Sequence, residues 1–199
     1  VMGSDGTVSA YSLTGGGRIW STSLRPAEEK GRGYGGGVAS GGGVIVAATP
    51  YRTVVGLDPS TGGVAWTAEV GAPARSAPTV SGGLAYVVTA DNVVHAISVA
   101  DGSEKWSHTG IGEATGVFGN ASPAVAGGKV VVPYTSGEIL AFGAESGDPL
   151  WLDALTGANK FTSVSGLNDV ARPVIHDGTV YAVSVSGRLI ATGLASGDR

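Results

Sequence analysis

A single phrase built around tryptophan recurs along the chain. It contains all four tryptophans, which are Trp20, Trp66, Trp106 and Trp151. A glycine lies four residues before each of them, at Gly16, Gly62, Gly102 and Gly147. A small residue lies ten before, at Ala10, Gly56, Ala96 and Ala141. A fifth copy, with Ala191 and Gly197 in place, stops at Arg199 before its tryptophan would be due.

The spacing of this phrase limits the fold to one class of repeat architecture. Successive glycine markers lie 40 to 50 residues apart, which is the period of four-stranded propeller blades. Between Ser76 and Trp106, turn residues separate four short β-branched or aromatic runs, at 77–80, 84–89, 93–97 and 105–106. No window has a sustained helical period. The sequence predicts an all-β fold, a β-propeller of four-stranded antiparallel blades.

We expect one partial propeller domain over residues 1–199. Its parts are the end of a blade at 1–24, whole blades at 36–70, 75–109 and 120–155, and an incomplete blade at 169–199. Together they predict an open arc of about four blades. Uncovered strand edges and apolar blade faces favour association. We therefore expect this chain, made alone, to aggregate or to pair two arcs.

The amino-acid composition agrees with short strands that are joined by tight turns and buried between stacked sheets. Glycine makes up 35 of the 199 residues, against a usual share of about 7%, and tight turns between strands require it. Charged residues are 14% of the chain and the mean hydropathy is +0.21. The longest apolar runs, such as residues 43–48, are far shorter than the roughly 20 residues that a membrane-spanning helix requires.

The net charge and the absence of cysteine exclude some classes of partner and of site. The net charge is −4, and no stretch clusters lysine and arginine with aromatic residues, so nucleic acid is not an expected partner. The chain has no cysteine, which excludes disulfides and thiolate metal sites and leaves the compartment open.

The tryptophans are interpreted as structural docking residues. Four copies at a fixed register favour packing between blades over stacking on a ligand, with each indole N–H reaching a backbone carbonyl. We expect the small residue ten positions earlier to let the neighbouring blade approach. The Asp-x-x-Thr-Gly or Asp-Gly turn that follows it is expected to reverse the chain.

The phrase from Gly56 to Trp66, Gly-Leu-Asp-Pro-Ser-Thr-Gly-Gly-Val-Ala-Trp, resembles the tryptophan-docking phrase of PQQ-type propellers. Within that superfamily the chain resembles the BamB family along essentially all of its 199 residues. The resemblance implies an eight-bladed ring, of which this chain would be a piece. It also implies a periplasmic lipoprotein of the machinery that assembles β-barrels in the bacterial outer membrane, anchored by lipid outside this chain and needing no cofactor.

Two segments, 116–123 and 165–173, match the positions where BamB has loops that contact its barrel partner, BamA. The resemblance implies these partner-binding residues: Val117, Phe118, Leu167, Asn168, Asp169 and Arg172. Phe118 stands where BamB has an arginine, and Ala171 replaces the second aspartate of an Asp-Val-Asp phrase. A more apolar version of the contact is therefore expected.

The lengths of the loops between blades indicate the same two segments, independently of the family resemblance. The distance from a tryptophan to the next proline of the Ser/Ala/Arg-Pro signal grows along the chain, being 12 residues to Pro78, 17 to Pro123 and 22 to Pro173. The loop at 21–36 is also long, with Glu28, Glu29, Lys30, Arg32 and Tyr34. Insertions in repeat proteins collect on one face, often the binding face. The alternative is that these loops are solvated connectors.

Enzyme motifs are incomplete. The glycines at 31, 33 and 36 fit a dinucleotide fingerprint by letter, but a strand rather than a helix should follow them. The histidines, His95, His108 and His176, lack the spacing of metal ligands. The aspartates beside turns, Asp5, Asp91 and Asp177, are expected to accept backbone N–H groups. No Gly-x-Ser-x-Gly phrase is present.

Three functions remain, and the first is favoured. It is a non-catalytic scaffold that binds the periplasmic domains of BamA, with unfolded outer-membrane proteins as further candidate clients. The second is a dehydrogenase propeller binding PQQ and Ca²⁺, for which the sequence offers no cluster of oxygen ligands. The third is a generic extracellular sensor or adhesion propeller, since a fold does not fix a function.

Overall fold

The computed structural model describes residues 1–110, 121–155, 171–184 and 187–199. These residues form strands and turns without a helix, and all their strand pairs are antiparallel. The all-β prediction is confirmed. Within the same ranges there is accordingly no helix of the length and apolarity needed to cross a membrane.

The strands form meanders of two, four, four, four and three strands. The first sheet holds β1 (Thr7–Tyr11) and β2 (Arg18–Ser23). The first blade holds β3 (Gly37–Gly41), β4 (Val44–Ala48), β5 (Thr53–Leu57) and β6 (Val64–Glu69). The second blade holds β7 (Thr79–Ser81), β8 (Leu84–Val88), β9 (Val93–Ser98) and β10 (Glu104–Thr109). The third blade holds β11 (Ala124–Ala126), β12 (Lys129–Pro133), β13 (Glu138–Gly143) and β14 (Pro149–Ala154). The last sheet holds β15 (Val174–His176), β16 (Thr179–Val183) and β17 (Leu189–Gly193).

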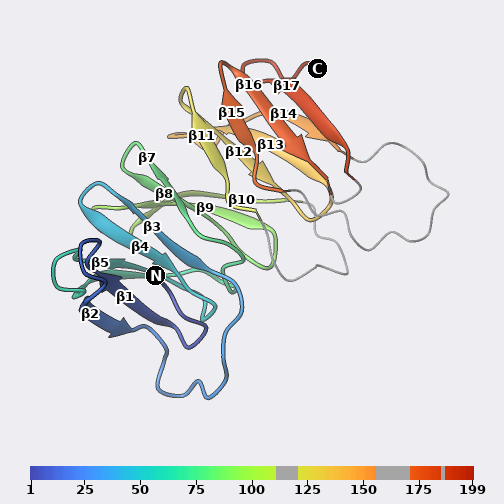
Figure 1. The fold of residues 1–199 in the computed structure, drawn as a ribbon. Helices are drawn as coiled ribbons and strands as arrows, with labels where there is room; N and C mark the ends of the chain where they lie inside the picture. The colour runs from blue at the N-terminus through green and yellow to red at the C-terminus, as the bar shows by residue number, and fades with distance from the viewer. Residues whose placement is uncertain (111–120, 156–170, 185–186) are drawn as a thin grey trace.

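The sheets follow one another along an arc, from β1 and β2 in blue to β15, β16 and β17 in red (Figure 1). The apolar core lies between successive sheets. Val54 of β5 clusters with Ile97 of β9, and Tyr86 of β8 clusters with Phe142 of β13. All four side chains are at most 1% exposed. Burial of one blade against the next therefore supplies the main stabilisation, as in a propeller.

Two-residue turns join the first and second strands of each sheet from β3 onward. The pairs are Gly42-Gly43, Gly82-Gly83, Gly127-Gly128 and Asp177-Gly178. Their φ angles lie between 45° and 79°, the left-handed values that a type I′ hairpin turn needs. The Asp177 carboxylate, expected to accept backbone N–H groups, instead lies 3.2 Å from Nε2 of His176.

Every tryptophan reaches from one sheet to the next. The indole N–H groups donate to backbone carbonyls as follows: Trp20 to Pro59 at 2.8 Å, Trp66 to Val99 at 2.9 Å, Trp106 to Ala144 at 3.0 Å and Trp151 to Leu194 at 3.0 Å. All four acceptors occupy the same position, in the turn between the third and fourth strands of the following repeat.

The repeated glycine of that turn makes room for the indole. A Cβ added to Gly62, Gly102, Gly147 or Gly197 would lie 2.5 to 2.8 Å from the tryptophan of the preceding sheet. The same glycines have φ between 72° and 78°, a conformation that favours glycine. Glycine at this position thus allows the left-handed backbone of the turn and leaves space for the tryptophan ring of the preceding sheet.

The small residue ten positions before each tryptophan lies directly opposite it on the neighbouring strand, in the pairs Ala10–Trp20, Gly56–Trp66, Ala96–Trp106 and Ala141–Trp151. Gly56 pairs directly with Trp66 across β5 and β6 of its own blade. A Cβ on Gly56 would lie 2.2 Å from Cε2 of Trp66. Gly56 therefore makes space for the indole of its own blade, a contact that the repeat spacing does not reveal. The expected role of the small residue toward the neighbouring blade stays a prediction, and Ala96 and Ala141 belong to the apolar clusters between successive blades.

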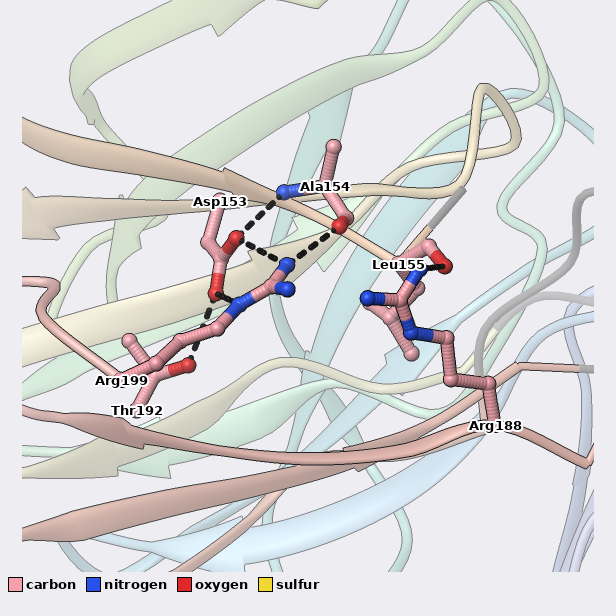
Figure 2. Close-up of polar contacts among 6 residues, drawn as sticks. All are labelled: Asp153, Ala154, Leu155, Arg188, Thr192 and Arg199. Carbon is pink, nitrogen blue, oxygen red and sulfur yellow. Dashed lines mark hydrogen bonds and ion pairs between the residues drawn. The ribbon is translucent and has the colours of Figure 1, made fainter. Parts of the chain in front are cut away.

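A polar cluster joins the third blade to the last sheet (Figure 2). Asp153 of β14 accepts hydrogen bonds from Thr192 Oγ1 at 2.8 Å and from Nε and Nη2 of Arg199 at 3.1 and 2.6 Å. Arg199 Nη2 also donates to the Ala154 carbonyl at 2.7 Å. Burial raises the pKa of the Asp153 carboxyl, but hydrogen bonds from Arg199, Thr192 and the Ala154 N–H outweigh burial, so the pKa lies below its ordinary value of 3.8.

This cluster predicts an acid-sensitive contribution to stability. Because the folded-state pKa of Asp153 is depressed, its contribution is present above the unfolded-state value near 3.8 and is lost as pH falls through the folded-state pKa. Urea unfolding of the unaltered chain and of Asp153→Asn, at pH 7 and at pH 3, should give a difference in unfolding free energy that shrinks at pH 3. An equal difference at both pH values would contradict the role of the ionised carboxylate.

Candidate binding face formed by the inter-blade loops

The loops that link one sheet to the next share a side of the arc with the turns between the second and third strands. Each of these turns contains a left-handed residue: Gly6, Arg52, Asn92, Gly137 and Gly187. The carbonyls of the first four accept the N–H that follows the last strand of the same repeat, from Leu24, Val70, Gly110 and Leu155 in turn, at 2.8 to 2.9 Å. These bonds fix where each inter-blade loop begins.

The first inter-blade loop, residues 24–36, follows β2 and extends at the bottom of Figure 1. Its glycines allow close backbone contact. A Cβ on Gly33 would lie 2.1 Å from Cγ of Pro50, and one on Gly35 would lie 2.6 Å from the Ala74 carbonyl oxygen. Between them Tyr34 is 77% exposed. Strand β3 follows the glycines directly, so they form no phosphate-binding helix start.

The second inter-blade loop is held by backbone bonds to two blades. Ala74 N–H donates to the Thr49 carbonyl of the first blade at 3.0 Å, and Arg75 N–H donates to Val88 of the second at 3.0 Å. The Arg75 guanidinium also donates to the Ala90 carbonyl. This short loop therefore serves as a rigid connector.

A buried amide and hydroxyl join the second and third blades beside the face. Asn92 Nδ2 donates to Thr135 Oγ1 at 2.8 Å, and Thr135 Oγ1 donates to Asn92 Oδ1 at 3.1 Å. The two residues are 2% and 7% exposed. No sequence motif predicts this pair. Its signal was an asparagine at the turn position that Gly137 occupies in the next repeat, because asparagine tolerates left-handed φ and adds a side-chain amide.

Most of the predicted partner-binding residues lie outside the described residues. They are Val117, Phe118, Leu167, Asn168 and Asp169. Arg172 is described and exposed, beside the buried Pro173. The N–H of Ala171 donates to the Val183 carbonyl at 2.9 Å, and Arg188 Nη1 donates to the Leu155 carbonyl at 3.3 Å. Arg172 thus sits on a backbone anchored to β16, with its side chain available to a partner.

The opposite side of the arc differs in charge. Its turns between third and fourth strands carry carboxylates: Asp58, Asp101, Glu145, Asp148 and Asp198. Hydrogen bonds from the N–H and hydroxyl of Ser103 lower the pKa of Asp101 to about 2. The inter-blade loops and neighbouring turns carry most of the described arginines: Arg25, Arg32, Arg52, Arg75, Arg172 and Arg188. The inter-blade side also carries Glu28, Glu29 and Asp91, so its charge is mixed.

Three side chains in the second blade are ordered as in a catalytic triad, with a hydroxyl, a histidine and a carboxylate. Thr89 Oγ1 lies 3.5 Å from His95 Nε2, and His95 Nδ1 lies 2.6 Å from Glu104 Oε2. Thr89 is 0% exposed, so its hydroxyl cannot reach a substrate. That hydroxyl donates at 2.6 Å to the Asp91 carboxylate, which was expected to accept backbone N–H groups. The contacts link β9 to β10 and support no nucleophile.

Metal ligands do not gather either, as far as the structure describes the chain. Across those ranges no three histidine or acidic side chains lie close enough together to hold an ion. Within the described ranges, the exposed side chains of the inter-blade loops form the candidate functional site.

Comparison with known proteins decides the family. The family model described as "Outer membrane protein assembly factor BamB" matches residues 4–199. This chain belongs to the BamB family. The BamB of Yersinia pestis is 31% identical over 199 residues, which cover 97% of this chain and 51% of that protein. The chain spans about half the length of the curated BamB relatives it matches.

Solved structures agree with the BamB assignment. The crystal structure of BamB from Moraxella catarrhalis superposes with a TM-score of 0.83 and 25% identity, over 98% of this chain and 57% of that one. Quinohemoprotein alcohol dehydrogenase from Comamonas testosteroni superposes with a TM-score of 0.73 over 99% of this chain and 40% of that one. Its identity is 15%, so that likeness shows the propeller fold alone. The predicted family and the propeller fold are confirmed.

Proposed function

We propose that this BamB-family chain is a non-catalytic scaffold in outer-membrane protein assembly, and that its inter-blade loops bind the periplasmic domains of BamA. The observation that carries the proposal is the family match across residues 4–199. The relatives from Yersinia pestis and Escherichia coli are named outer membrane protein assembly factors. A periplasmic, outer-membrane-associated location follows from the same proposal.

The described part of the face supports a binding role. Backbone bonds fix the start of each loop, so a partner would meet a surface that needs little ordering, and binding to such a surface costs less conformational entropy. Arg172 presents an exposed cation on this surface. Phe118 and Asp169 belong to the proposed contact by their place in the sequence.

Titration calorimetry of the full-length protein that contains these residues, against the periplasmic domains of BamA from the same organism, tests the proposal. Phe118→Ala, Asp169→Ala and Arg172→Ala should each be compared with Arg18→Ala, an exposed arginine at the start of β2 on the opposite side of the arc. We expect at least one loop variant to weaken binding by about 1 kcal/mol or more, the scale of an interface hot spot, and the control to change little.

A second titration with PQQ and Ca²⁺ tests the enzyme alternative. Saturable uptake of the quinone together with no binding of BamA would overturn the scaffold. Binding of BamA that none of the loop variants weakens would place the contact elsewhere on the chain and overturn the proposed site.

A further inference from the structure

We propose that Tyr34, with Arg32 and Arg52, forms a preformed contact for an acidic segment of a protein partner. The inference rests on the proposed function, because it adds a contact to the same face. It assigns a role to the first inter-blade loop, which lies two blades before segment 116–123 and three blades before segment 165–173.

Close packing on both sides holds Tyr34 in place. Gly33 lies against Pro50 and Tyr51, where an added Cβ would meet side-chain atoms at 2.1 and 3.5 Å. Its N–H donates to the Ser4 carbonyl at 3.0 Å. Gly35 lies against the backbone of Ala74, with 2.6 Å between an added Cβ and the carbonyl oxygen. The backbone of Tyr34 is thus fixed between Ser4 and Pro50 on one side and Ala74 on the other before any partner arrives.

The exposure of Tyr34 is not explained by the fold. Its side chain is 77% exposed, although a large aromatic ring gains free energy when it is buried. Tyrosine is among the residues most often found as interface hot spots. A fixed backbone keeps the entropy cost of such a contact low. These features suit a residue that is buried by a partner and not by its own chain.

Two arginines set the chemistry of that partner. Arg32 precedes Gly33, and Arg52 follows Tyr51, so the Gly33 contact brings both to the same turn. Both are exposed. None of the ion pairs within the described ranges involves either guanidinium. Carboxylates pair with guanidinium groups in two-pronged geometry, so an acidic polypeptide segment fits beside the tyrosine ring. Glu28 and Glu29, earlier in the same loop, repel any polyanion, so the contact is limited to carboxylates that reach the two arginines directly.

Calorimetric titration with the periplasmic domains of BamA tests the inference at two salt concentrations. We expect Tyr34→Ala to weaken binding at least tenfold. The double variant Arg32→Ser, Arg52→Asn should weaken binding and reduce its dependence on salt, because exposed ion pairs are screened. Asparagine suits the left-handed φ of 63° at position 52. Tyr11→Ala is the matched control. Tyr11 is 49% exposed and is the last residue of β1, at the end of that strand away from the first inter-blade loop.

The outcomes separate this inference from the proposed function. Binding by the unaltered chain that survives Tyr34→Ala and the arginine variant overturns the inference and leaves the scaffold intact. No binding by the unaltered chain overturns both. Weakening by Tyr34→Ala with an unchanged salt dependence in the arginine variant overturns the acidic character of the partner. Equal thermal unfolding midpoints for all the variants would confirm that binding, and not folding, is being compared.

Discussion

Replacing Trp66 with alanine is expected to lower the free energy of unfolding by about 3–5 kcal/mol, the usual cost of removing a large buried aromatic side chain. Trp66 is 8% exposed and belongs to the apolar cluster between the first and second blades. Its N–H also donates to the Val99 carbonyl at 2.9 Å. The substitution therefore removes both apolar contact and the only hydrogen bond that the indole can make.

Two further variants separate those contributions. Trp66→Phe keeps an aromatic ring against Gly102 but removes the N–H, so we expect a smaller loss, on the order of 1–3 kcal/mol. Thr67→Ala, at the exposed neighbouring position of β6, should change stability by less than about 0.5 kcal/mol. Urea unfolding followed by circular dichroism measures all three. A Trp66→Ala chain as stable as Thr67→Ala would rule out the docking role.

The repeat could be predicted because its signals are local and recur. A glycine, a turn and a tryptophan within eleven residues mark the outer hairpin of each repeat, and four copies reinforce one another. Strand ends were less predictable. The run at 77–80 begins two residues before β7 (Thr79–Ser81), because Pro78 lacks the N–H that a ladder needs. The run at 105–106 is much shorter than β10 (Glu104–Thr109), whose outward side chains are polar and leave no apolar alternation.

The contacts around the candidate face could not be predicted in the same way. Asn92 and Thr135 lie 43 residues apart, and Asp153 and Arg199 lie 46 apart. Each pair meets only because successive blades stack, so neither residue has a signal within its own repeat. Which of the loop side chains is exposed depends on the same packing. Tyr34 is exposed although Tyr86, of the same residue type, is 1% exposed between blades.

Gly102→Ala is expected to destabilise the chain by about 2–4 kcal/mol, and Gly16→Ala by only about 1 kcal/mol. Both glycines occupy the same turn of the repeat and have left-handed φ angles of 75° and 67°. Alanine therefore meets similar backbone strain at both positions. The neighbours differ. A Cβ on Gly102 would lie 2.6 Å from Cε3 of Trp66, whereas one on Gly16 would meet no atom within 4 Å.

The difference in unfolding free energy between Gly102→Ala and Gly16→Ala measures how much the docked tryptophan, beyond the backbone conformation, disfavours any residue but glycine. If the added methyl group displaces Trp66, the Gly102→Ala chain should also show a red-shifted, more solvent-exposed tryptophan fluorescence, and Gly16→Ala should not. Combining Gly102→Ala with Trp66→Ala should then cost less than the sum of the two single changes, because the clash no longer exists once the ring is gone. Strict additivity, or equal costs at the two glycines, would show that backbone strain alone selects glycine in this turn.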